Sequence, residues 1–235
     1  MKKIVSVILV LTIMIAVMPL SASAAGKLAT TQENFFVVNS YKIYGYAYAR
    51  IENVGDKPVE YSAGLLEIYD ANGDTLTSDT YLSVYGKYLQ PGEYAYVKVY
   101  DSIDTAESYS DVDDYMLTVT GKSSSGNITK RFACETQWIP DYQISKYSTR
   151  DYMFATFTND SSETVYDIEV VLALLDDDDN ILYVDTVGLY SAVGVNPGST
   201  ITVKTYVSDS MTEAFERDGY TATHVDAFAY VYVEE

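Results

Sequence analysis

The segment GLLEIYDANGD, residues 64–74, reads as one strand followed by a tight turn. Leu66 and Ile68 alternate with other side chains, which is the period of two expected of a strand with one buried face. Asn72 and Gly73 tolerate the positive φ angles that a short hairpin turn requires. The segment therefore predicts a strand that ends at this turn and returns as an antiparallel neighbour.

The same pattern occurs again 106 residues further along the chain. A shift by this distance, without gaps, superimposes turn residues and apolar residues alike: Asn53 on Asn159, Val59 on Val165, Leu66 on Leu172, Asp70 on Asp176, Leu76 on Leu182, Pro91-Gly92 on Pro197-Gly198, Val97-Lys98 on Val203-Lys204 and Tyr100 on Tyr206. An offset that stays constant across strands and turns indicates a duplicated unit. We expect two copies of one domain of about 100 residues, which is an ordinary domain size.

Other segments of each copy also have the pattern of strands. Ala47, Ala49 and Ile51 alternate with larger side chains, and a third strand is expected over residues 75–84. Pro91-Gly92 fits the centre of a type II turn. Many short strands separated by turn signals predict an all-β protein, which here means two antiparallel immunoglobulin-like β-sandwich domains in tandem.

One short helix is expected in each copy. Ser210 and Glu213 have the spacing of a capping box, and Gly219 lies where such a helix would end. Residues 104–107 occupy the corresponding place in the first copy. The last strand of each copy is expected to follow its helix, over residues 115–120 and 227–233.

The N-terminus has the three parts of a secretory signal. Lys2 and Lys3 precede an apolar run over residues 4–20, and Ala22-Ser23-Ala24 supplies a site for cleavage. We expect a signal peptide over 1–24, a first sandwich over 25–121, a linker over 122–127 and a second sandwich over 128–235. The strand expected near residues 128–136 could instead close the first sandwich. The mature protein is expected to be secreted, without a membrane span.

The composition excludes several classes of function. The chain has 235 residues, with 34 Asp and Glu against 15 Lys and Arg, and a net charge of -19. This charge argues against binding of nucleic acid, which needs clustered cations. One Cys and one His exclude an internal disulfide and a zinc centre built from several thiolates or imidazoles. No phosphate-binding glycine loop or nucleophile elbow is present, so we expect no enzymatic activity.

The repeated pattern resembles the FxLYD domain, an immunoglobulin-like module of secreted and envelope proteins in bacteria. The resemblance rests on Asn53, on Leu66-Glu67-Ile68-Tyr69-Asp70, on Gly73 and on Pro91-Gly92. The second copy keeps Asn159, Asp176 and Pro197-Gly198, but has Leu175 in place of the tyrosine and Asp179 in place of the glycine. The resemblance implies a bacterial, extracytoplasmic and non-catalytic module, and it implies no ligand.

The two hairpin turns that follow the repeated strand are rich in oxygen ligands. These residues are Asp176, Asp177, Asp178 and Asp179 in the second copy, and Asp70, Asn72 and Asp74 in the first. Adjacent carboxylates repel one another, and a hard cation such as Ca²⁺ would relieve that repulsion. The alternative is a solvated turn, in which Asp and Asn are simply good turn formers.

Tyrosine is the second candidate feature. If the alanines of residues 47–51 face the core, several tyrosines share the opposite face of the sheet: Tyr44, Tyr46, Tyr48, Tyr94, Tyr96 and Tyr100. Tyrosine offers flat apolar area with a polar tip, which suits a sugar ring or a protein partner. The alternative is cross-strand packing on a solvated sheet face.

These features together predict a non-catalytic secreted or cell-surface binding protein of unspecified ligand. Its expected partner is a protein or another component of the cell surface. Two alternatives remain. One is a structural spacer whose acidic turns bridge through divalent cations, and the other is a carbohydrate-binding module that uses the tyrosine face. Calcium-dependent association would identify the first alternative, and glycan binding without calcium the second.

Overall fold

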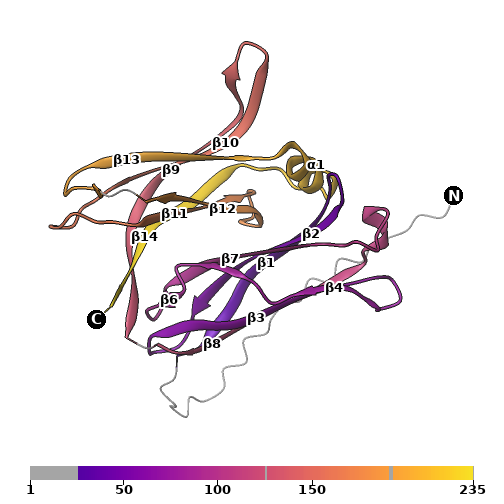
Figure 1. Ribbon diagram of the computed structural model, residues 1–235, viewed down its shortest axis with the longest axis horizontal. Coiled ribbons are helices and arrows are strands. Elements are labelled where there is room, and N and C mark those ends of the chain that lie inside the picture. The colour runs from indigo at the N-terminus through magenta and orange to yellow at the C-terminus, as the bar shows by residue number, and fades with distance from the viewer. Residues whose placement is uncertain (1–25, 125, 191–192, 235) are drawn as a thin grey trace.

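The protein is described by a computed structural model over residues 26–124, 126–190 and 193–234, so the predicted signal peptide lies outside the described residues. Figure 1 shows the strands stacked in layers, with helix α1 (Asp209–Arg217) at one side. The prediction of an all-β fold built from antiparallel sandwiches is confirmed. None of the helices among these residues has the length and apolar character needed to cross a membrane.

The first sandwich is formed by the N-terminal half of the described chain. One layer contains, in order, β1 (Leu28–Asn39), β2 (Ile43–Asn53), β7 (Tyr94–Ser102) and β5 (Ser83–Tyr85). The other layer places β3 (Val59–Tyr69) between β8 (Asp114–Ser123) on one side and β4 (Thr75–Asp79) and β6 (Tyr88–Leu89) on the other. Ala47, Ala49 and Ile51 of β2 and Leu66 and Ile68 of β3 are completely buried between the layers, as their alternation predicts.

The second sandwich is formed by the C-terminal half and shares one long strand between its layers. The strand order is β12 (Ile181–Leu189), β11 (Ile168–Leu175), β14 (His224–Glu234), β9 (Asn127–Ser145), β10 (Ser148–Thr158) and β13 (Thr200–Val207). Residues 127–133 of β9 pair with β14, and residues 134–145 pair with β10. The segment 128–136, which the sequence leaves ambiguous, therefore pairs with strands of the second half.

A buried asparagine joins three segments of the first sandwich. The side-chain amide of Asn53 donates to the backbone carbonyls of Lys57 at 2.8 Å and Leu89 at 3.0 Å. Its carbonyl oxygen accepts the backbone N–H of Gly55 at 3.0 Å. Buried backbone groups need hydrogen-bond partners. The Asn53 side chain, at the end of β2, supplies such partners to the turn that follows and to β6.

The second sandwich repeats this arrangement at the offset of 106 residues. Asn159 is also completely buried, and its amide donates to the carbonyls of Glu163 and Val195, both at 2.8 Å. Its carbonyl oxygen accepts the backbone N–H of Ser161 at 3.1 Å. The duplicated positions in the sequence therefore make corresponding hydrogen bonds in the structure.

The repeated Pro-Gly turn closes against the same asparagine. The backbone N–H of Gly92 donates to the carbonyl of Asn53, and that of Gly198 donates to the carbonyl of Asn159, both at 2.8 Å. Gly92 and Gly198 have φ angles of 80° and 74°. These angles lie in the left-handed region that the predicted turn requires of its glycine.

Two predicted segments differ from the structure. Residues 75–84 do not form one strand, because β4 pairs with β3 in one layer and β5 pairs with β7 in the other. Strands also enter the predicted linker 122–127 from both ends. Its first residues belong to β8, where Lys122 lies opposite Glu60, and Asn127 begins β9. Pairing with neighbouring strands therefore shortens the predicted linker at both ends.

The prediction of one helix per copy is correct only for the second copy. Helix α1 (Asp209–Arg217) begins after Ser208, whose hydroxyl accepts the backbone N–H of Met211, so the predicted cap at Ser210 is wrong by two residues. The first copy has only a 3₁₀ turn, η1 (Tyr109–Asp111), rather than a helix at 104–107. Ser108 and Asp111 form the capping box there, so the helical turn starts later than the repeat predicts.

Gly219 ends helix α1 as predicted. Its backbone N–H donates to the carbonyl of Glu216, and the N–H of Tyr220 donates to the carbonyl of Phe215. These two bonds satisfy carbonyls that the end of a helix leaves free, and they require a residue with positive φ at the glycine. The φ angle of Gly219 is 91°.

The two sandwiches pack directly on each other. The outer face of the β1–β2–β7–β5 layer contacts the second sandwich, so that Tyr48 and Tyr96 are as buried as core residues. The hydroxyls of Tyr94 and Tyr96 both donate to the carboxylate of Asp226 on β14, at 2.7 Å. The ring of Tyr48 lies 5.9 Å from that of Tyr183 on β12, measured between centroids.

Charged and aromatic contacts extend this interface to its edges. The ammonium group of Lys98 lies 3.2 Å from the Asp185 carboxylate across the interface. The guanidinium of Arg131 lies over the ring of Phe228 and donates to the backbone carbonyl of Tyr94. At the other edge, Phe36 of β1 packs edge-on against residues of α1 and the turn after it, Phe215 and Tyr220.

We expect Asn53→Ala and Asn159→Ala each to lower the free energy of unfolding by about 2–4 kcal/mol, because each leaves two backbone carbonyls without their amide donors. Asn39→Ala is the control, because Asn39 is exposed at the end of β1. The measurement is chemical denaturation followed by circular dichroism. A loss of less than about 0.5 kcal/mol in both buried variants would contradict the role given to the asparagines.

Two tyrosines of the interface provide a matched test of its polar contacts. The Tyr48 hydroxyl has no hydrogen-bond partner among the described residues, whereas the Tyr96 hydroxyl donates to Asp226. We expect Tyr96→Phe to lower stability by about 1–2 kcal/mol, and Tyr48→Phe to leave it unchanged or raise it. Thermal melting of both variants measures the difference. Equal losses would show that burial of the rings alone governs this interface.

Candidate functional site

The predicted tyrosine face is divided by the packing of the two sandwiches. Tyr48 and Tyr96 are completely buried and Tyr94 is half-buried, so the prediction that these three form an exposed ligand-binding face is wrong. The alternation of β2 and β7 places their rings on the outer face of the sheet, as expected. That face is covered by β12 and β14 of the second sandwich, which the alternation cannot reveal.

The remaining tyrosines lie at the end of the same sheet, where Tyr46 borders the interface. Tyr44, Tyr46 and Tyr100 lie there as predicted, and Tyr41, in the turn between β1 and β2, joins them. We call these four residues the tyrosine cluster. Tyr41 is 83% exposed and Tyr100 is 51% exposed, so the cluster is open to solvent.

The rings of the tyrosine cluster are in mutual contact. Tyr46 and Tyr100 lie on neighbouring strands with ring centroids 5.0 Å apart and planes inclined by 14°. Tyr44 lies 6.3 Å from Tyr46 and 6.5 Å from Tyr100, and Tyr41 lies 5.6 Å from Tyr44. The cluster therefore presents a continuous aromatic surface bordered by phenol hydroxyls.

The hydroxyls of Tyr44 and Tyr46 are hydrogen-bond donors at neutral pH. A hydrogen bond with Tyr41 and nearby negative charge raise the pKa of Tyr44 to about 12, and burial raises the pKa of Tyr46. Beside the cluster, the ammonium group of Lys42 pairs with the carboxylate of Asp104 at 2.8 Å. A polar hollow lies next to Tyr41, between this ion pair and Glu107. The site thus combines apolar area with a polar rim.

The acidic turns use their first carboxylate to hold the hairpin together. The Asp176 carboxylate accepts the backbone N–H groups of Asp178 at 3.0 Å and Asn180 at 2.8 Å, and the Asn180 amide at 2.9 Å. Asp177 is exposed at the tip. This arrangement explains why aspartate is present at position 176 without invoking a cation.

The first copy has the same turn. The Asp70 carboxylate accepts the backbone N–H groups of Asn72 at 2.8 Å and Asp74 at 2.9 Å, and these bonds lower the pKa of Asp70. Nowhere in the described ranges do three or more acidic, His or Cys side chains gather as metal ligands would. A calcium ion bound by either of these turns stays a prediction from the sequence.

The single histidine belongs to a solvent-exposed chain of hydrogen bonds. The ring of His224 contacts the Thr223 hydroxyl through Nδ1 at 2.9 Å and the Asp179 carboxylate through Nε2 at 3.1 Å. The Thr223 hydroxyl also lies 3.4 Å from the carbonyl of Leu175, to which it can donate.

Burial raises the pKa of the Cys134 thiol to about 11, so this sulfur is not a thiolate at neutral pH.

A second aromatic surface is present that the sequence analysis missed. It lies on the outer face of β9, β10 and β13, where four rings surround two cations: Tyr142, Tyr152, Phe154 and Tyr206, with Arg150 and Lys204. The offset of 106 residues provided the signal, because it places Tyr46 on Tyr152, Tyr100 on Tyr206 and Lys98 on Lys204.

Comparison with known proteins provides no family for the chain. No protein-family model and no curated protein sequence matches it. Among solved structures, the chain resembles "Structure of infectious bursal disease virus Gt strain" at 10% sequence identity, covering 93% of this chain and 68% of that one. The TM-score is 0.19, which is too low to support an argument about fold or function.

We expect Asp176→Ala to lower the melting temperature by several degrees, because three N–H groups lose their acceptor, whereas Asp177→Ala should leave it unchanged. Both variants and the parent are melted in calcium and in EDTA. A calcium-dependent rise in the parent that Asp177→Ala abolishes would contradict the interpretation of these residues as a simple turn, and would establish a cation site.

Proposed function

We propose that the protein is an exported, non-catalytic binding protein of the bacterial cell surface, which holds a protein partner through the tyrosine cluster. The supporting observation is the cluster itself, with two strongly exposed rings, Tyr41 and Tyr100, in one continuous aromatic surface. Tyr48 and Tyr96 lie further along the same strands, and the second sandwich covers them. Tyrosine is enriched at protein interfaces because it offers rigid apolar area together with a hydroxyl.

Export is the part of this proposal that rests on the sequence. The cationic, apolar and small-residue segments over 1–24 have the order of a signal peptide. The net charge of -19 supports solubility outside the cell and weak adsorption to anionic surfaces. The resemblance to FxLYD domains supports the same location.

The orientation of the rings favours a protein partner over a sugar. A carbohydrate stacks on a free aromatic face, but Tyr46 and Tyr100 lie nearly parallel to each other with centroids 5.0 Å apart. Each therefore covers part of the face of the other, and the pair presents edges and hydroxyls outward. Edges and hydroxyls suit the mixed apolar and polar contacts of a protein interface.

We expect Tyr41→Ser/Tyr44→Ser/Tyr100→Ser to abolish binding of a cell-surface protein without lowering the melting temperature by more than a few degrees, because these rings lie outside both cores. The control is Tyr81→Ser, since Tyr81 is 88% exposed elsewhere. The measurement is photo-crosslinking to an extract of the bacterial cell surface through benzoylphenylalanine at position 100 or position 81.

A specific partner crosslinked only from position 100, and no longer crosslinked from that position when Tyr41→Ser and Tyr44→Ser are added, is the expected result. Equal labelling from both positions would contradict the proposal. If the parent binds a glycan in the absence of calcium and the triple variant does not, the partner is a carbohydrate and not a protein.

A further inference from the structure

The outer face of β9, β10 and β13 is an uncovered sheet face at one end of the stack of layers. Its outward side chains lie in rows across the three strands: Glu135 with Thr156 and Thr202, then Gln137 with Phe154 and Lys204, then Ile139 with Tyr152 and Tyr206, and finally Tyr142 with Arg150. We call this face the platform. Its counterpart in the first copy is the face of β1, β2 and β7, part of which the second sandwich covers.

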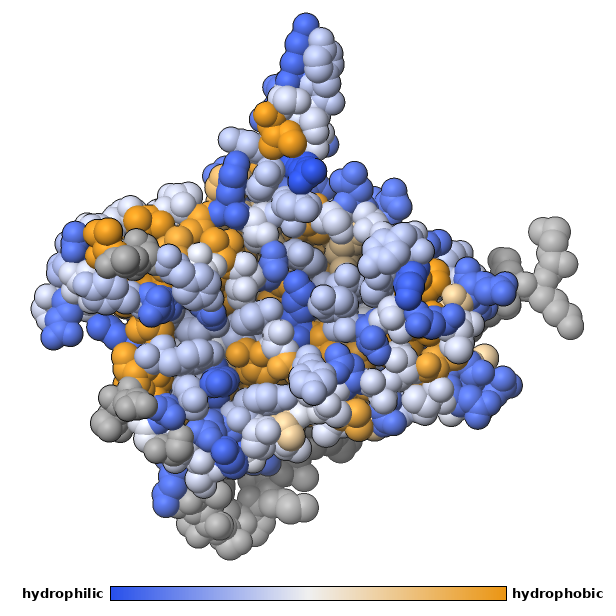
Figure 2. Space-filling view, viewed as in Figure 1, coloured by the Kyte–Doolittle hydropathy of each residue, from blue (hydrophilic) through white to orange (hydrophobic). Residues whose placement is uncertain are grey.

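The platform continues into a projecting hairpin. Figure 1 shows the tips of β9 and β10 rising well beyond the other strands. All residues from 143 to 150 are exposed, and Tyr147 at the tip is 86% exposed. Figure 2 shows this projection as mostly hydrophilic, with a hydrophobic area near its base.

The cations of the platform contact aromatic rings instead of carboxylates. The Lys204 ammonium lies 4.5 Å from the ring centroid of Tyr152, and the Arg150 guanidinium lies 4.4 Å from that of Tyr206. Neither cation forms an ion pair within the described part of the chain. Lys98, which corresponds to Lys204, does pair with a carboxylate, Asp185 of the sandwich that covers it.

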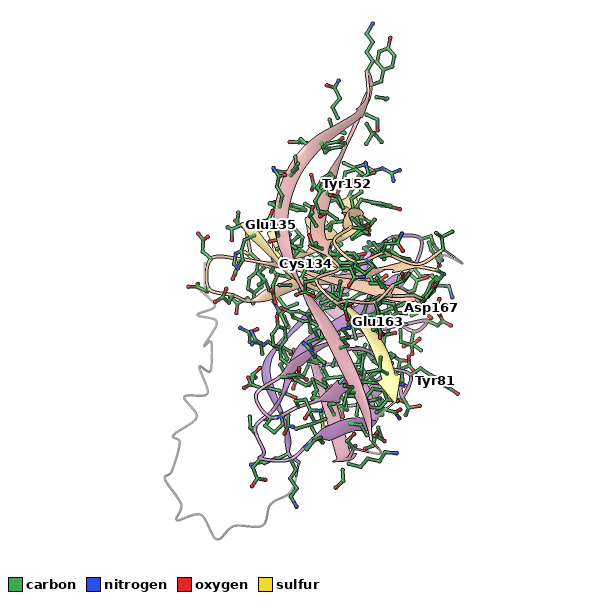
Figure 3. All side chains as sticks on the ribbon, turned by 90° about the vertical axis from the view of Figure 1, so that its left-hand side faces the viewer. Tyr81, Cys134, Glu135, Tyr152, Glu163 and Asp167 are labelled. Atoms are coloured by element: carbon green, nitrogen blue, oxygen red, sulfur yellow. The ribbon has the colours of Figure 1, made fainter. Side chains whose placement is uncertain are left out.

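Two charges of the platform, those of Glu135 and Lys204, are placed so that they complement each other between two copies, whereas Arg150, on β10, lies near the axis. Glu135 lies on β9 and Lys204 lies on β13, one row apart, with β10 between them. Figure 3 shows Tyr152 closer to the base of the hairpin than Glu135. A two-fold rotation about an axis along β10 exchanges β9 with β13, so that Glu135 of each copy approaches Lys204 of the other.

We infer that two copies of this chain associate face to face through the platform, about a two-fold axis along β10. A second copy is the occupant because the same face of the first copy already binds a sandwich of this kind, through a lysine, a tyrosine and stacked rings. Isologous pairing of one face is the commonest way in which soluble proteins form dimers.

The expected affinity is modest. Four rows at about 7 Å and three strands at about 5 Å give roughly 400 Å² per copy, or about 800 Å² in total before the hairpins contribute. Interfaces of this size belong to weak and transient complexes. The net charge of -19 on each copy also opposes association at low ionic strength. We therefore expect a dimer that dissociates at micromolar concentrations.

The test uses sedimentation velocity of the mature protein from about 5 to about 500 µM, with charge-reversed variants of the platform. The parent should form a dimer as concentration rises. Lys204→Glu and Glu135→Lys should each remain monomeric. In either variant, both contacts between position 135 of one copy and position 204 of the other would join like charges. A mixture of the two variants should recover the dimer, since both contacts are then between opposite charges. Native mass spectrometry with one variant labelled with ¹⁵N identifies the mixed species.

Two controls separate this inference from general effects. Lys57→Glu makes the same change of charge at an exposed position away from the platform, and should dimerise as the parent does, as should the triple variant of the tyrosine cluster. Melting curves check that each variant is folded. A parent that stays monomeric over the whole range overturns the inference, and so does a mixture of the two variants that recovers no dimer.

Discussion

The burial of the tyrosine face of β2 and β7 against the second sandwich is the constraint on which the arrangement of the molecule depends. The rings of Tyr48 and Tyr96 need a cover to leave water, and the hydroxyls of Tyr94 and Tyr96 need an acceptor once they are covered. Asp226 provides that acceptor from β14. Because apolar and polar requirements are met together in one docking position, the two sandwiches hold a defined orientation, and the tyrosine cluster and the platform become separate surfaces.

Comparison of the two copies shows how the sequence distinguishes a covered face from an open one. Four positions of the covered face carry Arg50, Glu52, Tyr94 and Tyr96, and the corresponding positions of the platform side carry threonine. The hydroxyls of Thr156 and Thr202 lie 2.8 Å apart, as do those of Thr158 and Thr200. Pairs of threonine suit a strand face in contact with water. Terminal units of a repeat protein likewise need a polar outer face.

Most of the fold could be predicted because its determinants are local. The alternation in β2 and β3, the Asn-Gly turn and the Pro-Gly turn each lie within a few residues, and the duplication repeats the Pro-Gly turn at 197–198. The docking of the sandwiches could not be predicted in this way. Tyr48 and Tyr44 have the same place in the alternation, yet one is buried and the other is not. The two differ because β12 and β14 cover Tyr48 but do not extend over Tyr44. This cover depends on contacts between residues more than 100 positions apart in the sequence.

The candidate surfaces follow the same division between local and non-local information. The repeat places Tyr41 on Tyr147, Tyr46 on Tyr152 and Tyr100 on Tyr206, so both copies have an aromatic surface at the end of one sheet. Tyr44 corresponds to Arg150, however, and this replacement gives the platform a cation where the tyrosine cluster has a phenol. A neutral aromatic surface has no preference for negative charge, whereas a cation that lacks a carboxylate partner favours an acidic one. Divergence at this position therefore gives two corresponding surfaces of one duplicated fold different charge.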